Sequence, residues 1–265
     1  MQRWVVVLMT LTLGLSACEQ VQTKGGSAGA SSPADEGAQP VSAGAQHAKT
    51  FTDLAAAYVQ RGQFKVALDD VRKAIAADNR YGPAYNVLGL IYMELAEDQL
   101  AEENFRKAVD LDRADSEAHN SYGWFLCTRG RYDEALAQFT DALRNPLYGT
   151  PEQALANTGL CSEKKGNLEK AEASFMKALK LQPDYPLATV SLARLYFQEG
   201  KLNEAERLLN RYHEVAPLTA ESLWLGVRVE RKRGDKDQET AFATQLHKRF
   251  PNSKENELMT SGRFE

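Results

Sequence analysis

The sequence predicts an all-α fold, a right-handed superhelical solenoid built from six similar helix–turn–helix units. Three observations predict it: a turn residue, almost always glycine, recurs along the chain, an alanine recurs in the same register, and both columns share one two-residue insertion. The period is 34 residues, or 36 at the insertion. Self-similarity of this length is typical of stacked helical repeats. The turn column is Gly62, Ala96, Gly130, Gly166, Gly200 and Gly234, and the alanine column is Ala67, Ala101, Ala135, Ala171 and Ala205.

Each unit has the spacing of a pair of amphipathic helices. Apolar and small residues recur three and four positions apart in both halves of a unit, so each helix has one apolar face. One pair of helices cannot bury its own apolar faces, and neighbouring pairs must therefore stack. A 34-residue helix–turn–helix unit is that of the tetratricopeptide repeat, which the units resemble. The solenoid covers residues 48–253, in units 48–81, 82–115, 116–149, 152–185, 186–219 and 220–253.

The sixth unit departs most from the pattern. It has Glu239 where the other units have alanine. The last repeat of a solenoid must present a polar outer face, so such a departure is expected of a capping unit. Residues 254–265 continue beyond the repeat and are expected to form a C-terminal tail.

The first 17 residues have the features of a bacterial lipoprotein signal peptide. Arg3 precedes an apolar stretch, Trp4–Gly14, which is too short to cross a hydrocarbon core of about 30 Å. The next residues, Leu15-Ser16-Ala17-Cys18, resemble the lipobox, in which the cysteine receives a diacylglycerol and, after cleavage, an N-acyl chain. We therefore expect residues 1–17 to be removed and Cys18 to be lipidated. The alternative is a plain signal peptide with an incidental cysteine.

Residues 18–47 are expected to form the lipidated cysteine and a flexible tether. Gly, Ala, Ser and Pro make up 17 of the 23 residues in the segment Lys24–Gln46. Such a segment cannot bury enough apolar surface to offset its conformational entropy. Glu19 follows the cysteine in place of the aspartate that would favour retention at the inner membrane. The expected location is therefore the outer membrane.

Composition and motifs argue against an enzyme. The net charge is −4, with 32 Lys and Arg against 36 Asp and Glu, which argues against a nucleic-acid-binding protein. The chain has no His-Glu-x-x-His, phosphate loop, Gly-x-Ser-x-Gly or Cys-x-x-Cys motif. We expect no catalytic residue, no metal, no small-molecule substrate and no cofactor apart from the covalent lipid on Cys18.

Cys127 and Cys161 occupy the first helices of neighbouring units. A disulfide between them is conceivable, but the sequence cannot establish the Cα separation of about 5.5 Å that it needs. Buried free thiols are the favoured interpretation.

The function is then expected to lie in a surface. First helices of tetratricopeptide arrays line a concave face, where the family usually binds an extended or helical peptide. Trp124 and Phe197 do not fit the core columns and are expected to be exposed aromatic anchors. The alternative for any single residue is that it packs within the groove. The predicted protein-binding groove consists of Asn86, Leu90, Met93, Asn120, Trp124, Cys127, Leu160, Val190, Arg194, Phe197, Trp224 and Arg228.

A lipobox, a short tether and six tetratricopeptide units together resemble the PilF/PilW family of type IV pilus biogenesis lipoproteins. Three local stretches carry the resemblance. They are residues 120–126 followed by 131–135 in the third unit, Leu147-Tyr148 before the insertion, and residues 223–228 in the sixth unit.

The resemblance implies a pilotin, which is a non-enzymatic adaptor anchored by lipid to the periplasmic face of the outer membrane. Such a protein binds secretin subunits and promotes their outer-membrane localisation and multimerisation in type IV pilus biogenesis. The implied partners are a secretin subunit and, through the lipid, the outer membrane. The alternative is a general periplasmic scaffold lipoprotein for envelope-remodelling enzymes or outer-membrane assembly factors, which the same array would serve.

Overall fold

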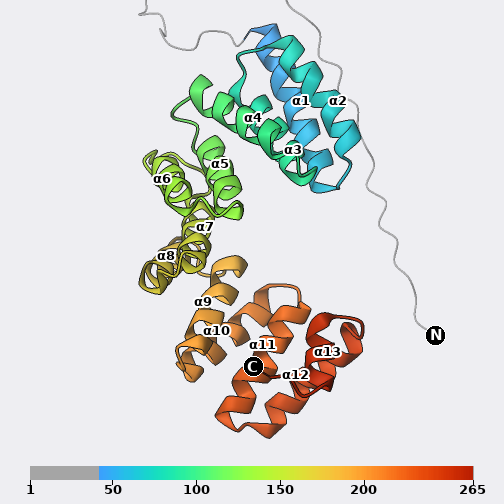
Figure 1. Cartoon of the computed structure of the whole chain (residues 1–265), viewed down its shortest axis with the longest axis vertical. Helices are drawn as coiled ribbons and strands as arrows, with labels where there is room; N and C mark the ends of the chain where they lie inside the picture. The colour runs from blue at the N-terminus through green and yellow to red at the C-terminus, as the bar shows by residue number, and fades with distance from the viewer. Residues whose placement is uncertain (1–41, 265) are drawn as a thin grey trace, which may run out of the picture. The chain divides into compact units, whose positions relative to one another are not determined.

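The computed structural model describes residues 42–264, which form thirteen helices and no strand (Figure 1). None of these helices is both long enough and apolar enough to cross a membrane. The predicted signal peptide, Cys18 and most of the predicted tether lie outside the described residues. The helices are α1 Ala43–Gln60, α2 Phe64–Ala77, α3 Gly82–Glu94, α4 Asp98–Leu111, α5 Ser116–Thr128, α6 Tyr132–Ala142, α7 Pro151–Lys164, α8 Leu168–Leu181, α9 Pro186–Gln198, α10 Leu202–Val215, α11 Ala220–Arg233, α12 Lys236–Arg249 and α13 Lys254–Thr260.

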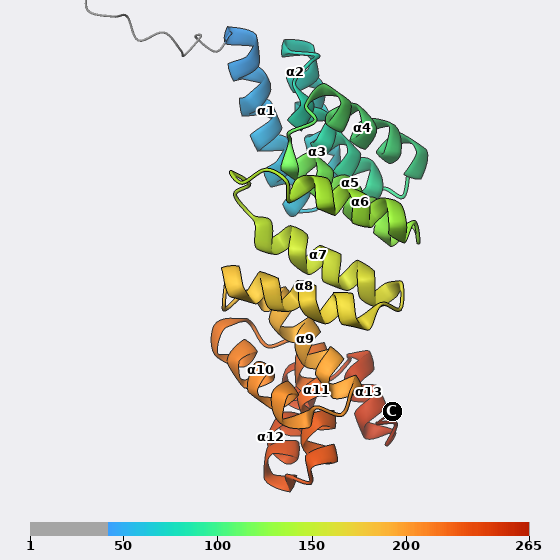
Figure 2. The same cartoon turned by 90° about the vertical axis from the view of Figure 1, so that its left-hand side faces the viewer.

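The first twelve helices pack as six pairs, and each pair packs on the next (Figure 2). The first helix of each pair also contacts the first helix of the following pair. Within residues 42–264, the second helices α2, α4, α6, α8, α10 and α12 do not contact one another. The stack therefore curves, with the first helices on its inner face. This is the all-α superhelical solenoid that the sequence predicts.

A close approach between the two helices of a unit explains the column of small residues. In four units a glycine of the first helix lies against the ring of a phenylalanine sixteen positions later in the second helix. In units one and five, alanine replaces the glycine and a smaller side chain replaces the phenylalanine. Small and large residues therefore complement each other within each unit. The pairs are Ala55–Val71, Gly89–Phe105, Gly123–Phe139, Gly159–Phe175, Ala193–Leu209 and Gly226–Phe242.

The turn column lies where the chain reverses between the two helices. Every member has a positive φ, and Ala96, at +59°, is the only non-glycine residue among 42–264 with this property. The left-handed region costs an L-residue about 1–2 kcal/mol, whereas glycine enters it freely. Backbone geometry therefore imposes this column, and its period is visible in the sequence for that reason.

The first helix begins earlier than expected. Helix α1 starts at Ala43, after Ser42, whose side-chain oxygen accepts a hydrogen bond of 3.1 Å from the backbone N–H of Ala45. Residues 43–47, which the sequence analysis assigned to the tether, are therefore helical. Gly44 packs against the end of α2, because a Cβ there would lie 2.8 Å from the carbonyl oxygen of Ala77.

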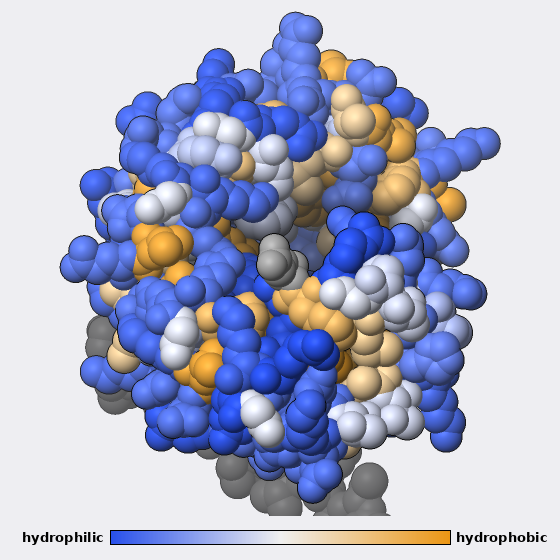
Figure 3. Space-filling view, turned by 60° about the horizontal axis from the view of Figure 1, so that its bottom comes forward, coloured by the Kyte–Doolittle hydropathy of each residue, from blue (hydrophilic) through white to orange (hydrophobic). Residues whose placement is uncertain are grey.

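The predicted C-terminal tail is also partly helical. Helix α13 follows Ser253, which caps it, and packs on α11 and α12. Leu258 and Met259 join the core cluster of the sixth unit. The space-filling view of this end shows apolar patches separated by polar surface rather than one continuous apolar face (Figure 3). Residues 254–264 are thus a cap on the solenoid.

Ion pairs connect consecutive units. Arg131 contacts Glu102 of the preceding unit at 2.7 Å and Glu134 of its own unit at 2.6 Å. Burial alone would raise the pKa of the Glu102 carboxyl, but hydrogen bonds and charge from Arg131 outweigh it and lower that pKa. Partly exposed pairs of this kind contribute about 0–1 kcal/mol each, so they help orient the units but do not drive folding. The same connection recurs in later units as Lys201–Glu172 and Arg233–Glu206.

Gly123→Ala is expected to destabilise the solenoid by about 1–3 kcal/mol. The added Cβ would lie 2.7 Å from the ring of Phe139 and 3.2 Å from the carbonyl oxygen of Ala135, so the helices must separate. Urea or thermal unfolding followed by circular dichroism measures the change. Gly149→Ala is the control, because its Cβ meets nothing within 4 Å. Equal midpoints for the two variants would contradict the proposed close packing.

Candidate protein-binding groove

The predicted groove residues all lie on first helices, but the structure divides them by exposure. Seven are partly exposed: Leu90, Met93, Trp124, Leu160, Val190, Arg194 and Arg228. Five are buried: Asn86, Asn120, Cys127, Phe197 and Trp224. The accessible part of the predicted groove is therefore concentrated on α3, α5, α7 and α9.

A hollow of about 300 Å³ brings together the inner faces of α3, α5 and α7. Three of its lining residues belong to the predicted groove. The other four come from the same helices and were missed by the sequence analysis. On α5 the lining residues have the spacing i, i+3, i+4, i+7 of one helix face, a pattern that could have identified Glu117 and Ser121. The hollow, called the Trp124 hollow below, is lined by Leu90, Glu117, Asn120, Ser121, Trp124, Gln153 and Asn157.

Trp124 lies half-buried in this hollow. One side of its side chain packs against the core cluster that contains Phe105 and Phe125. The ammonium group of Lys164 lies 5.6 Å from the centre of its ring. Trp124 therefore combines a fixed position with accessible aromatic surface, as an anchor for a partner side chain requires.

Buried asparagines lie beside Trp124. The Asn157 side-chain amide donates a hydrogen bond of 3.0 Å to Oδ1 of Asn120. Oδ1 of Asn86, on α3, is buried and has no hydrogen-bond partner among the described residues. An unsatisfied buried acceptor costs about 1–3 kcal/mol, so a donor supplied by a ligand would be favoured there.

Glu117 gives the hollow one carboxylate. Burial raises the pKa of this carboxyl group, and a hydrogen bond of 3.2 Å from the Tyr148 hydroxyl opposes the shift. Tyr148 belongs to the loop between α6 and α7, where the two-residue insertion lies. This hydrogen bond attaches the loop to the start of α5, at the edge of the hollow.

Phe197 and Trp224 correct the prediction of exposed anchors in the last two units. Phe197 is only 3% exposed, because the guanidinium of Arg228 and the ammonium of Lys232 lie 4.6 and 4.5 Å from the centre of its ring. Trp224 is buried beside Phe264, with ring centres 5.3 Å apart. Residues from another unit and from beyond the repeat cover these two aromatics.

Arg194 has a structural role in addition to its groove position. Its guanidinium contacts Glu163 of α7 and Glu221 of α11, both at 3.0 Å. The side chain therefore ties three consecutive first helices together, and its charge is already compensated.

Cys127 and Cys161 form a disulfide, so the expectation of free thiols is wrong. Their Cα atoms are 5.8 Å apart, because equivalent positions of two neighbouring first helices lie within bridging distance. Cys127 is 1% exposed and cannot contact a partner as the groove prediction supposed. The bond instead joins α5 to α7 behind the Trp124 hollow.

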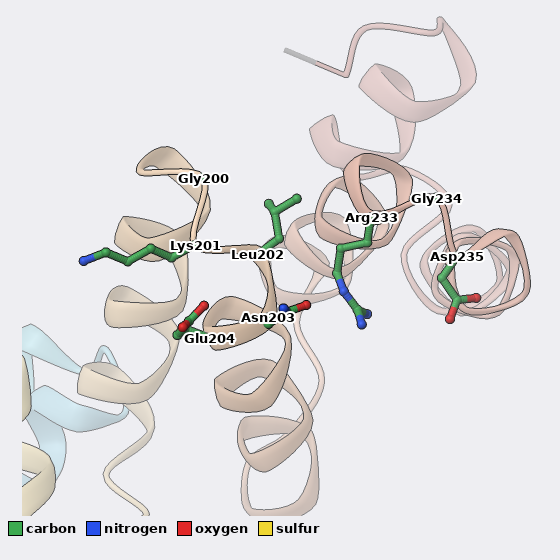
Figure 4. Close-up of a pocket in the computed structure, with 8 residues that line it drawn as sticks. All are labelled: Gly200, Lys201, Leu202, Asn203, Glu204, Arg233, Gly234 and Asp235. Atoms are coloured by element: carbon green, nitrogen blue, oxygen red, sulfur yellow. The ribbon is translucent and has the colours of Figure 1, made fainter.

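Another hollow, of about 660 Å³, lies away from the predicted groove, between the turns 200–204 and 233–235 (Figure 4). Its Arg233 is paired with Glu206 and Glu230, at 2.7 and 2.6 Å. In residues 42–264 no group of three or more His, Cys, Asp or Glu side chains is placed to hold a metal ion. The Trp124 hollow is therefore the candidate site.

Tetratricopeptide-repeat family models match residues 82–115, 104–137, 126–186 and 164–223. The type IV pilus assembly protein PilF of Pseudomonas aeruginosa is 28% identical over 135 residues, which is 51% of this chain and 54% of PilF. That alignment thus spans about half the length of the curated relative. A solved structure of P. aeruginosa PilF has a TM-score of 0.75 at 27% identity, covering 83% of this chain and 100% of that one.

A crystal structure of PilW, described as a widely conserved type IV pilus biogenesis factor, matches with a TM-score of 0.73 and 33% identity. The match covers 81% of this chain and 99% of PilW. The chain belongs to the PilF/PilW family of tetratricopeptide-repeat proteins. This confirms the resemblance that the repeat and the local motifs indicate. The coverage of the PilW chain includes all of its fold, so the six-unit architecture is shared rather than a single repeat.

Reduction of the Cys127–Cys161 bond is expected to lower the melting temperature. The bond connects residues 34 positions apart, and the chain-entropy model assigns about 3–4 kcal/mol to a loop of that size. Circular dichroism with and without a reducing agent measures the shift. The double variant Cys127→Ala, Cys161→Ala should not respond to the reducing agent. An unaltered melting temperature of the unmodified chain after complete reduction would count against a structural role for the bond.

Proposed function

We propose that this protein is a non-enzymatic, lipid-anchored adaptor of type IV pilus biogenesis, a pilotin that binds secretin subunits. The observation that carries the proposal is membership of the PilF/PilW family, whose described members are type IV pilus assembly and biogenesis proteins. The adaptor promotes outer-membrane localisation and multimerisation of the secretin by holding its subunits near the membrane.

The Trp124 hollow has the chemistry to bind an extended peptide segment of a secretin subunit. Leu90 and Trp124 offer apolar contact surface, and Met93 and Leu160 extend it along the inner face. The asparagines provide hydrogen-bonding groups for a peptide backbone. Apolar anchors give affinity by removing water from both surfaces, while amide hydrogen bonds fix the direction and register of the bound segment.

Lipidation of Cys18 supplies the second part of the mechanism. Each buried CH₂ group contributes about 0.8 kcal/mol, so the diacylglycerol and the N-acyl chain together hold a protein on a membrane. Confinement to the membrane raises the effective concentration of the adaptor near its partner without any further contact. Weak groove contacts are then sufficient for assembly, and the adaptor needs no catalytic group.

Trp124→Ala is expected to weaken binding of the purified periplasmic part of the secretin by roughly 30-fold, since a central aromatic anchor contributes about 2 kcal/mol or more. Titration calorimetry or a surface-binding assay measures the affinity. Met176→Ala is the control, because Met176 is exposed on the second helix α8, outside the groove. If both variants bind as tightly as the unaltered chain, Trp124 does not contact the secretin.

Cys18→Ala is expected to leave the solenoid folded but to remove it from the outer membrane, because the variant lacks the acceptor for the lipid. Membrane fractionation and circular dichroism of the purified chain provide the two readouts. Recovery of the variant in the outer-membrane fraction at the level of the unaltered protein would exclude Cys18 as the anchor.

A further inference from the structure

The chain turns back on itself after helix α13. Gly262, with φ of +73°, reverses the direction of the backbone. The N–H of Gly262 donates to the carbonyl of Met259 at 3.1 Å, and the N–H of Arg263 donates to that of Leu258 at 2.9 Å. These contacts end the helix and direct Phe264 toward α11, beside which α13 lies (Figure 2).

Phe264 occupies a defined set of contacts on α11. Its ring centre lies 5.3 Å from that of Trp224 and 3.7 Å from the guanidinium of Arg231. Its carbonyl oxygen accepts a hydrogen bond of 3.0 Å from Nε of Arg228. The three α11 residues have the spacing i, i+4, i+7 of one helix face. They form a site, called the Arg228 site below, that recognises an aromatic ring and a backbone carbonyl together.

The Arg228 site has excess positive charge. Arg228 is half-buried above the ring of Phe197, and burial lowers the pKa of its guanidinium. Among residues 42–264, neither Arg228 nor Lys232 forms an ion pair with a carboxylate. A cation held against aromatic rings retains hydrogen-bonding capacity for an oxygen of a ligand.

Phe264 is separable from the cap that α13 forms. Helix α13 has its own attachment: the side chain of Asn256 is buried, donates to the carbonyl of Pro251 at 2.7 Å, and contacts Nδ1 of His247 at 3.2 Å. The residues 261–263 between the helix and Phe264 are exposed, and Phe264 is only partly buried. Release of residues 261–264 therefore leaves the packing of α13 intact.

We propose that the Arg228 site binds an aromatic residue of an extended peptide segment, and that Phe264 occupies it as an intramolecular ligand that such a segment displaces. The short connection to α13 gives Phe264 an effective concentration in the millimolar range, which a competing segment must exceed. The site deepens the proposed adaptor function by adding a second point of contact at the end of the groove. Its test uses only a peptide of this chain and is independent of the secretin.

The experiment uses the hexapeptide with the sequence of residues 260–265, added to isotopically labelled protein while the indole N–H resonance of Trp224 is followed by NMR. In the full-length variant Phe264→Ala, the peptide is expected to shift this resonance with half-saturation at a concentration at least tenfold lower than in the unaltered chain. The same peptide with alanine in place of phenylalanine should cause no shift. Arg263→Ala, which keeps Phe264, is the matched control and should respond like the unaltered chain.

Three results would overturn the proposal. One is an equal response of Phe264→Ala and the unaltered chain, and another is equal binding of the two peptides. The third is loss of the native spectrum of α11 to α13 both in Phe264→Ala and in Phe264→Leu, which keeps most of the apolar volume. That loss would make Phe264 a fixed part of the core rather than an exchangeable ligand.

Discussion

The fold depends on the close approach of two helices at one position in each unit. Where a glycine of the first helix lies against a phenylalanine ring of the second, the two backbones come nearer than any side chain on the first helix would allow. The phenylalanine then fills the interior of its own unit. Because the same contact recurs, with Ala–Val and Ala–Leu in two units, all units have similar shape and can stack in a regular array.

The inner face follows from this arrangement. First helices contact one another along the stack, so equivalent positions in successive units become neighbours although they are far apart in the sequence. At one level this proximity produces the Cys127–Cys161 bond, and beside it the hydrogen bond between Asn120 and Asn157. The Trp124 hollow is formed by the same three helices. Its geometry is therefore supported by a covalent link and by the packing of each unit.

The repeat was predictable because the backbone imposes it: a left-handed turn selects glycine, and a close helix approach selects a small residue, at a fixed period. Exposure within the groove was not, since it depends on contacts that have no period. Phe197 is covered by Arg228 and Lys232 of the next unit, and Trp224 by Phe264 from beyond the repeat. The start of α1 was hidden in a segment of low complexity, where only the Ser42 cap marks it.

The central claim is that the inner face near Trp124 binds the secretin in the cell envelope. The most direct measurement places a photo-crosslinking amino acid at Met93, on the inner face, and in a second strain at Met176, on the exposed surface of α8. The account predicts a crosslink to the secretin from position 93 and none from position 176. A secretin crosslink from position 176 alone, or crosslinks from position 93 only to cell-wall enzymes or outer-membrane assembly factors, would contradict it.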